Sequence, residues 1–307
     1  MVIMEDKKVV ILMSTYNGEK YICEQLESLI NQTYKNIKIF IRDDGSMDRT
    51  VDVIKEIQKK RNNIILIEGQ NIGFINSFFE LLKLADDDAD YFAYCDQDDV
   101  WMEDKIERAV KCMEKAETSK PVLYFSNSDY YDGNMNFLKT ADKNKTYHFR
   151  NSLVECVTQG MTMVINKVTK NLIVNNRPQK CLYHDWWTYM ICSGFGEIIY
   201  DDKSLVKYRR HNKSVTVEGK SPIQLLAWRV KKFFVGDSLK QIKRQWIEYK
   251  IFYYDQLSEK NQKLLNLFAR EKYNFFIALR KTFYPGRFRR KIVDEISVRL
   301  LFLVGLL

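Results

Sequence analysis

The chain is poor in glycine and proline, with 12 Gly and 4 Pro among 307 residues. This scarcity excludes a linker-rich or disordered protein. Six cysteines are scattered without a CxxC pair, so we expect reduced thiols of a cytosolic protein, with neither a disulfide framework nor a zinc site. The longest terminal apolar run, residues 300–307, is under half the length of a membrane-spanning helix. The short run at residues 9–13 follows two acidic residues, so we expect no signal peptide.

The common phosphate-binding loops are absent as well. No GxGxxG segment follows the first apolar run, and the chain contains no Walker lysine motif. Ordinary dinucleotide and ATP phosphate loops are therefore excluded, and phosphates would have to be held in another way. A hydrophobic content of 46% is nevertheless ample for a sizeable core, in one large domain or two smaller ones.

Charge is distributed unevenly along the chain. Residues 203–307 carry 24 basic and 8 acidic side chains, a net of +16, whereas residues 1–202 carry 25 and 32, a net of −7. This asymmetry indicates two regions with opposite electrostatic roles. We expect a catalytic domain over residues 1–217 and a basic amphipathic helical region over residues 218–307.

The first half alternates short apolar runs with helical patterns. Buried parallel strands are nearly continuous in apolar residues. Four such runs occur, at residues 9–13, 37–41, 64–67 and 91–95. Segments with apolar side chains at helical spacing lie between them, at residues 19–31, 48–60 and 74–85. The alternation predicts a doubly wound α/β sheet, in which ligands bind at the carboxyl ends of the strands.

Polar segments follow three of the predicted strands. These segments are Ser14-Thr15-Tyr16-Asn17, Asp43-Asp44-Gly45-Ser46 and Asp96-Gln97-Asp98-Asp99. Three carboxylates at one strand end repel one another and resist desolvation, so they usually need a cation. Hard oxygen ligands suit Mg²⁺ or Mn²⁺, which share their coordination shell with phosphates. The alternative is a solvated acidic turn in which Asp99 or Asp104 caps the next helix.

The three segments resemble, in order and spacing, the motifs of family-2 glycosyltransferases with the GT-A fold. The resemblance covers about residues 8–215 and is closest to the rhamnosyltransferase-like bacterial branch. It extends to His184-Asp185-Trp186-Trp187 and Tyr208-Arg209-Arg210-His211. It implies a GT-A type doubly wound mixed sheet, here followed by the basic α-helical extension.

The resemblance also implies roles for individual residues. Asp98 would be the principal ligand of Mn²⁺ or Mg²⁺, with Asp96 beside the ribose and metal and His211 beside the metal-diphosphate. Asp185 would be the catalytic base. The nucleotide-binding residues would be Ser14, Thr15, Tyr16, Asp44 and Asp96. The acceptor or sugar-binding residues would be Gln159, Gly160, His184, Trp186 and Trp187.

Each of these roles has a structural alternative. Asp44 could belong to an Asx turn, and Asp185 could be a buried hydrogen-bond acceptor. Trp186 and Trp187 could be core residues, and His211 could be part of a plain basic surface.

The basic region beyond residue 217 predicts amphipathic helices. One begins near Pro222, and further stretches run over residues 239–257, 264–283 and 292–307. Basic helices with Trp and Phe suit an anionic bilayer interface. The alternative is a helical subdomain that packs on the catalytic domain or forms a homodimer. No nucleic-acid module is recognisable, so we expect no nucleic-acid partner.

The expected function is an inverting, metal-dependent transfer of a sugar to a lipid-linked or polysaccharide acceptor. The donor predicted from the resemblance is dTDP-L-rhamnose, with a UDP-hexose as the alternative. We expect a cytoplasmic enzyme, peripheral on the inner face of the cell membrane. A sugar nucleotidyltransferase is disfavoured because Ser14-Thr15-Tyr16-Asn17 contains no basic residue. A polysaccharide-binding relative without catalysis remains a rival, and Asp96, Asp98 and Asp185 argue against it.

Overall fold

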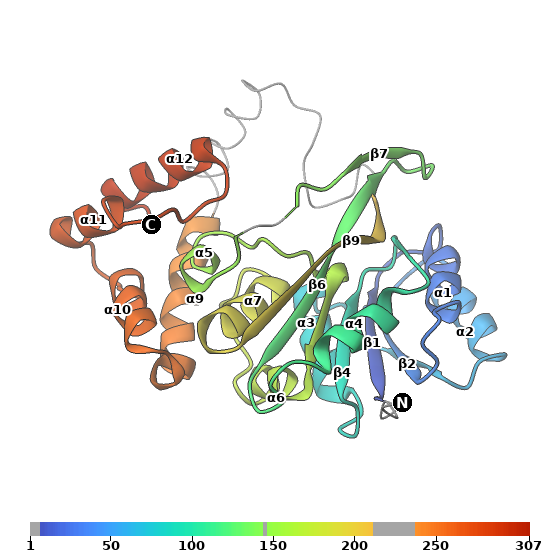
Figure 1. Cartoon of the computed structure of the whole chain (residues 1–307). Coiled ribbons are helices and arrows are strands. Elements are labelled where there is room, and N and C mark those ends of the chain that lie inside the picture. Colours follow the sequence, from blue (N-terminus) through green and yellow to red (C-terminus); the bar gives the residue numbers. More distant parts are fainter. Residues whose placement is uncertain (1–6, 144–145, 211–236) are drawn as a thin grey trace. The chain divides into compact units, whose positions relative to one another are not determined.

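The computed structural model describes residues 7–143, 146–210 and 237–307 (Figure 1). The chain divides into two compact units. The first, here called the sheet unit, comprises Met1–Lys145, Thr158–Arg177 and Gly196–Arg210. The second, the helical unit, comprises Thr146–Val157, Pro178–Phe195 and His211–Leu307. Each unit is described by itself.

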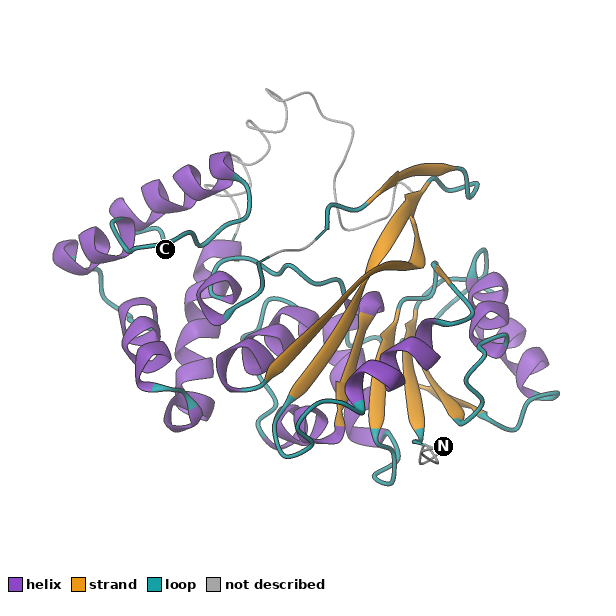
Figure 2. Cartoon of the chain, in the orientation of Figure 1, coloured by secondary structure: helices purple, strands orange, loops and turns teal. Residues whose placement is uncertain are grey.

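The sheet unit is built on one mixed sheet, drawn in orange in Figure 2. Its strands are, in spatial order, β3 (Ile64–Glu68), β2 (Ile37–Asp43), β1 (Val9–Thr15), β4 (Tyr91–Cys95), β8 (Met163–Asn166), β6 (Val122–Tyr131), β9 (Glu197–Arg209) and β5 (Val100–Trp101), with β7 (Phe137–Thr140) beside β6. The pairs among β1 to β4 are parallel, and β8 pairs antiparallel with both β4 and β6. The predicted α/β class and the mixed sheet are confirmed.

Helices cover both faces of this sheet, as a doubly wound fold requires. Apolar residues of α1 (Ile22–Ile30), α2 (Thr50–Gln58) and α4 (Lys105–Met113) form one buried cluster with alternate residues of the central strands. On the other face, Phe78 of α3 (Phe74–Leu84) packs edge-on against Tyr94 of β4. Lys170 of α6 (Lys167–Asn175) lies over the ring of Phe92. A short 3-10 helix, η1 (Gly160–Thr162), precedes β8.

The helical unit has an aromatic core. Its helices are α5 (Phe149–Ser152), α7 (His184–Phe195), α9 (Ser238–Tyr253), the 3-10 helix η2 (Tyr254–Gln256), α10 (Glu259–Phe268), α11 (Phe275–Thr282) and α12 (Ile292–Leu303). Trp187 of α7 packs edge-on against Tyr249 of α9, and Trp246 of α9 packs edge-on against Phe268 of α10. Burial of such large rings is the main source of stability in a small helical domain.

The structure refines several expectations for the second half of the chain. Residues 264–283, expected as one amphipathic stretch, form the end of α10 and then α11. The Asn274 side chain accepts a hydrogen bond from Ile277 N and so starts a new helix. The expected helix near Pro222 and the expected boundary at residue 217 lie outside the described residues. Residues 146–157 and 178–195, placed by sequence within the catalytic domain, group with the helical unit.

A search for membrane-spanning helices was negative. Among the described residues, none of the helices combines the length and the apolar character needed to cross a bilayer.

Candidate active site

The parallel register brings the three polar segments to one edge of the sheet. Thr15, the last residue of β1, lies opposite Asp43 of β2, and Met13 of β1 lies opposite Cys95 of β4. Asp44 N donates a 2.8 Å hydrogen bond to Thr15 O, which joins the first two strand ends. The residues that follow these strands therefore gather where a doubly wound sheet binds its ligand, as the sequence predicts.

Gln97 fastens the acidic segment to the end of β1. Tyr16 N donates to Gln97 Oε1 at 2.9 Å, and Gln97 Nε2 donates to Tyr16 O at 3.1 Å. This two-way pairing places Gln97 beside Gly18, where an added Cβ would lie 2.3 Å from Gln97 Oε1. Any other residue at position 18 would force the Gln97 side-chain amide to move away from the backbone of that residue.

The end of β2 is a tight turn organised by Asp43. Its Oδ1 accepts hydrogen bonds from Gly45 N at 3.1 Å and Ser46 N at 2.8 Å, and its Oδ2 accepts one from Thr15 Oγ1 at 3.0 Å. Gly45 has φ +82°, a conformation that L side chains rarely adopt. The Asx turn that the sequence offered as an alternative for Asp44 is thus made by Asp43.

Asp44 is buried next to this turn. Its Oδ1 accepts from Arg42 and from Ile72 N at 2.9 Å, and its Oδ2 accepts from Gly73 N at 2.9 Å. A carboxylate can accept about four hydrogen bonds, so one further donor can be accommodated. Asp44 is only 2% exposed, and the contact with a pyrimidine stays a prediction.

Arg209, at the end of β9, holds the acidic segment from the other side. Its backbone N–H donates to Asp99 Oδ1 at 3.0 Å and its Nε donates to Asp98 O at 2.9 Å. Its guanidinium also forms an ion pair with Glu24 of α1 and lies over the ring of Tyr21, 4.7 Å from the centroid. Arg209 is almost completely buried, and so it ties three elements of the sheet unit together.

The three carboxylates of the segment differ in exposure. Asp99 is fully buried, and burial, followed by the charges of Asp98 and Asp96, raises its pKa well above the usual range. Asp96 and Asp98 are half-buried and border solvent. Asp96 and Asp98 are therefore the more accessible carboxylates of the segment, and their contact with a metal or ligand stays a prediction.

Asp96 and Asp98 fit a divalent ion by the chemistry of their donors. Carboxylate oxygens suit Mg²⁺ or Mn²⁺, and these ions use one or two protein carboxylates when substrate phosphates complete the shell. Within the part of the chain that the structure describes, no group of three or more His, Cys, Asp or Glu is arranged to hold a metal ion alone.

The predicted sugar-binding residues Gln159 and Gly160 also lie in the sheet unit, just before β8. Gln159 Oε1 accepts a 2.7 Å hydrogen bond from Ser128 Oγ on β6. Gly160 begins the 3-10 helix η1, which packs against β4 and β6. Contact of either residue with a sugar stays a prediction.

The predicted base, Asp185, lies in the first turn of α7, in the helical unit. Its side chain is half-buried, and Oδ1 accepts a 2.7 Å hydrogen bond from Trp186 N. The neighbouring His184 is buried, and burial lowers its pKa to about 3, so its ring is neutral. A neutral ring adds no charge to the surroundings of the Asp185 carboxylate.

The two tryptophans of α7 are held inside the helical unit. Trp186 Nε1 donates a 2.6 Å hydrogen bond to Ser152 O of α5. Trp187 has no exposed surface and contacts the rings of Tyr249, Phe252 and Tyr253. Trp187 therefore packs as a core residue, the alternative that the sequence left open. His211, the remaining predicted site residue, lies outside the described residues.

Arg42, Gln97 and Arg209 were not among the residues singled out from sequence. The signal for Arg42 was present, because a charged residue follows the apolar residues Ile39, Phe40 and Ile41 two positions before Asp44. Gln97 and Arg209 bond mainly to backbone atoms that the fold brings near. Residue type alone therefore carried no sign of these contacts.

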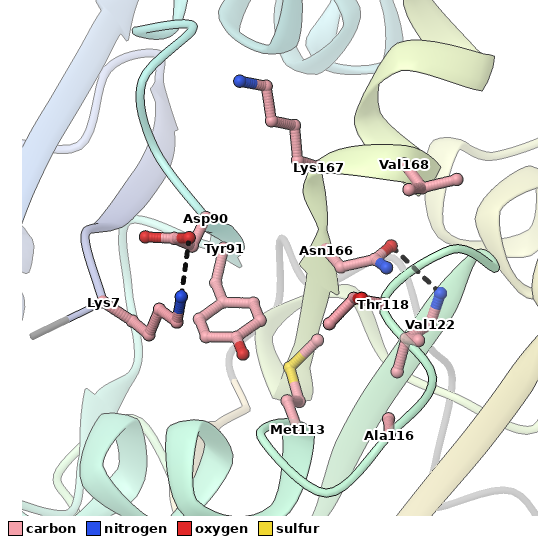
Figure 3. A pocket seen from close by; sticks show the side chains of 10 residues that line it. All are labelled: Lys7, Asp90, Tyr91, Met113, Ala116, Thr118, Val122, Asn166, Lys167 and Val168. Atoms are coloured by element: carbon pink, nitrogen blue, oxygen red, sulfur yellow. Dashed lines mark hydrogen bonds and ion pairs between the residues drawn. The ribbon is translucent and has the colours of Figure 1, made fainter. Parts of the chain in front are cut away.

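A cavity of about 120 Å³ lies elsewhere in the sheet unit (Figure 3). It is lined by Tyr91 and Val122, where β4 and β6 begin, and by Asn166, where β8 ends. Asn166 Oδ1 accepts a hydrogen bond from Val122 N at 3.0 Å, and Lys7 forms an ion pair with Asp90. The cavity is therefore at the opposite end of β4 from Asp96 and contains none of the predicted site residues.

Comparison with known proteins gives a family and a fold. The family model described as glycosyl transferase family 2 matches residues 10–173. The dTDP-rhamnosyl transferase RfbG of Shigella flexneri is 34% identical over 222 residues, which cover 66% of this chain and 72% of that protein.

Two further proteins extend this comparison. The UDP-Glc:alpha-D-GlcNAc-diphosphoundecaprenol beta-1,3-glucosyltransferase WfaP of Escherichia coli is 39% identical over 124 residues, 40% of this chain and 46% of that protein. The crystal structure of S. aureus TarS 1–349 in complex with UDP-GlcNAc has a TM-score of 0.54 at 14% identity and covers 97% of this chain and 92% of that one. At this identity the structural likeness shows the fold.

Proposed function

The chain belongs to glycosyl transferase family 2, and on this premise we propose that it transfers L-rhamnose from dTDP-L-rhamnose to a bacterial capsular or cell-wall polysaccharide. Family membership and the GT-A fold make it a nucleotide-sugar glycosyltransferase. The choice of donor is supported by the likeness to the dTDP-rhamnosyl transferase RfbG. The observation that carries the proposal is the sheet edge where Asp96 and Asp98 lie beside the ends of β1 and β2.

The donor would lie along this edge. Ser14 and Thr15 end β1 and Tyr16 follows it, and these residues would border the nucleotide, while Asp44 would accept one more hydrogen bond. Family-2 enzymes with the GT-A fold commonly use divalent metals. Asp98, with Asp96, would hold Mn²⁺ or Mg²⁺, which when bound neutralises charge that builds on the diphosphate leaving group. Gln97 and Arg209 hold the segment that carries both carboxylates, through hydrogen bonds to Tyr16 and to the Asp98 backbone.

Asp185 would act as the general base. A carboxylate at this position can take the proton of the acceptor hydroxyl, because that hydroxyl becomes more acidic as it attacks the anomeric carbon. The bond from the hydroxyl oxygen to the anomeric carbon forms as the bond to the diphosphate oxygen breaks. A single base opposite the leaving group gives inversion of the anomeric centre. Gln159, Gly160, His184 and Trp186 are the remaining candidates for the sugar and acceptor side.

A UDP-hexose is the second candidate donor. The likeness to WfaP favours it, since that protein is named for UDP-Glc and for a diphosphoundecaprenol acceptor. Its name also supports a lipid-linked acceptor for this chain, and a peripheral position on the inner face of the membrane would follow from such an acceptor. The two candidates share one site and one reaction type, and only the donor differs.

A donor panel tests the proposal. The purified chain is incubated with dTDP-L-rhamnose, UDP-glucose, UDP-galactose and UDP-GlcNAc in the presence of Mn²⁺, and release of the free nucleotide is measured. We expect turnover with dTDP-L-rhamnose and its loss in Asp98→Ala. Asp88→Ala is the matched control, because Asp88 precedes β4 at the end of that strand away from Asp96. Absence of turnover with every donor would refute the proposal.

A further inference from the structure

The helix α12 exposes a stripe made only of apolar side chains. Ile292, Ile296 and Leu300 recur every fourth residue, and Val304 continues the spacing just after the helix. They are 64%, 58%, 58% and 63% exposed. Residues four apart lie on one face of a helix, so these side chains form a continuous ridge.

The opposite face of α12 is already used for packing. Phe302 is fully buried and contacts the rings of Phe268 and Phe288, and Val298 is buried beside it. The exposed face of a surface helix is normally polar, so an exposed apolar stripe is unusual. One face of α12 is covered by the helical unit, and the other is open.

The neighbouring helix α11 enlarges this open surface. The two helices pack together, and Arg299 Nη1 of α12 donates to Thr282 O at the end of α11. We call residues 275–304 the α11–α12 hairpin. Its exposed large apolar side chains are Phe275, Phe276, Phe283, Ile292, Val293, Ile296, Leu300 and Val304. These are eight of the eighteen such side chains among the described residues, gathered within 30 residues.

Basic side chains accompany this surface. Arg280 is exposed on α11 between Phe276 and Phe283, and Lys291 is exposed directly before Ile292. The connecting segment adds exposed Arg287 and Arg290. Of the two acidic residues of α12, Glu295 is buried and accepts hydrogen bonds from Phe288 N and Arg299 Nε, whereas Asp294 is half-buried beside Val293. The exposed surface is therefore apolar with positive charge around it.

We propose that the exposed face of the α11–α12 hairpin docks on an anionic lipid bilayer and lies in its interface. An apolar helical surface with adjoining Lys and Arg matches the acyl–headgroup boundary, where basic residues are attracted to anionic headgroups. A symmetric dimer through the same face would bring two copies of one basic surface together, and like charges oppose such an interface. This proposal adds to the proposed function, because a lipid-linked acceptor would lie in the same bilayer. The evidence for bilayer binding comes from the α11–α12 hairpin alone.

Vesicle binding tests this assignment. The full chain is sedimented with vesicles of pure phosphatidylcholine and with vesicles containing phosphatidylglycerol. We expect binding to the anionic vesicles that weakens with salt, and a loss of about tenfold or more in the double variant Ile296→Ser/Leu300→Ser. Ile251→Ser on α9 is the matched control, since Ile251 is also exposed but lies outside the hairpin. The melting temperature confirms that each variant is folded.

The outcomes separate this proposal from the transferase activity. Nucleotide release from a soluble donor is measured on the same samples, and we expect the double variant to retain it. Vesicle binding without turnover of any donor would refute the proposed function and leave the bilayer assignment standing. Equal binding by the double variant and the wild type would overturn the assignment. A dimer that dissociates in the double variant, without vesicle binding by the wild type, would overturn it in favour of a second copy.

Discussion

At the scale of single residues, the carboxylates of the acidic segment differ in exposure. Asp96 and Asp98 border solvent, whereas Asp99 is buried and accepts a hydrogen bond from Arg209 N. Their neighbours in sequence are alike, and only the fold assigns them to different surroundings. This is why the sequence could identify the segment and its general role but could not reveal the bonds made by Gln97 and Arg209.

Asp185→Asn tests the proposed base. The amide keeps the size of the side chain and can still accept a hydrogen bond from Trp186 N, but it takes up no proton at neutral pH. We expect the transfer rate to fall by about 10²–10⁴, with donor binding and melting temperature unchanged. The measurement is transfer to an acceptor alongside calorimetric donor binding. Equal transfer rates for the variant and the wild type would remove Asp185 from the mechanism.

Lys105 presents a buried charge beside the site. It is fully buried, its Nζ lies 3.5 Å from the centroid of the Trp101 ring, and burial lowers its pKa to about 7. Between pH 7 and the ordinary lysine pKa of about 10.4, the unfolded chain holds a proton that the folded chain has released. The free energy of unfolding therefore rises with pH through this window, by on the order of 4 kcal/mol at most.

Lys105→Met should remove this dependence. Near pH 6 the wild type is destabilised by the buried Lys105 ammonium group. The attraction between that group and the Trp101 ring offsets part of this destabilisation. We expect the variant to be more stable there by about 1–4 kcal/mol, with the difference shrinking as the pH approaches 10. Urea unfolding at both pH values measures it. Lys111→Met, an exposed position on the same helix, is the control and should leave the pH dependence unchanged.

At the scale of elements, the sequence predicted the parallel half of the sheet well and the later half poorly. β1, β2 and β4 are buried on both faces and the edge strand β3 is half-buried, so their apolar runs are nearly continuous and identify them directly. β9 carries Asp201, Asp202 and Lys203 in its middle, and its pairing with β6 shifts register near that point. A strand with charged residues and an irregular register has no clear period in its sequence, so it was not predicted.

Arg209 links β9 to the loop after β4, and its replacement tests whether this link matters. Arg209→Lys keeps the charge and the backbone N–H but loses the guanidinium group, which contacts Asp98 O and Glu24 at the same time. We expect a lower kcat/KM and a higher KM for the donor, because Asp98 is held less firmly. Kinetic analysis at saturating Mn²⁺ measures both. Lys203→Ala, an exposed residue of the same strand, should leave the kinetics unchanged.

At the scale of the whole molecule, acidic side chains dominate the first part of the chain and basic side chains the last part. The acidic first part contains the sheet edge proposed to bind the donor, and the basic last part contains the α11–α12 hairpin. The domain boundary predicted from sequence, at residue 217, lies outside the described residues and stays a prediction. The helix α7, with Asp185, makes aromatic contacts with α9 and groups with the helical unit. Such contacts join residues more than 60 positions apart, which no local pattern reveals.

Donor binding should be visible as stability of the folded chain. A ligand that binds only the folded state at 100 times its dissociation constant adds about 2.7 kcal/mol. We therefore expect dTDP-L-rhamnose with Mn²⁺ to raise the melting temperature. A chain with Asp98→Ala should show a much smaller rise at the same concentrations. An equal rise in both proteins would place the donor elsewhere.

The most direct test of the sheet edge as a metal-diphosphate site is calorimetric titration with dTDP. The titration is run with Mn²⁺, with EDTA, and with Asp98→Ala in Mn²⁺. We predict that dTDP binds the wild type with Mn²⁺. EDTA and Asp98→Ala should each weaken binding by about tenfold or more, since EDTA removes the metal ion and Asp98→Ala removes its proposed ligand. An affinity unchanged by EDTA and by Asp98→Ala would contradict the account.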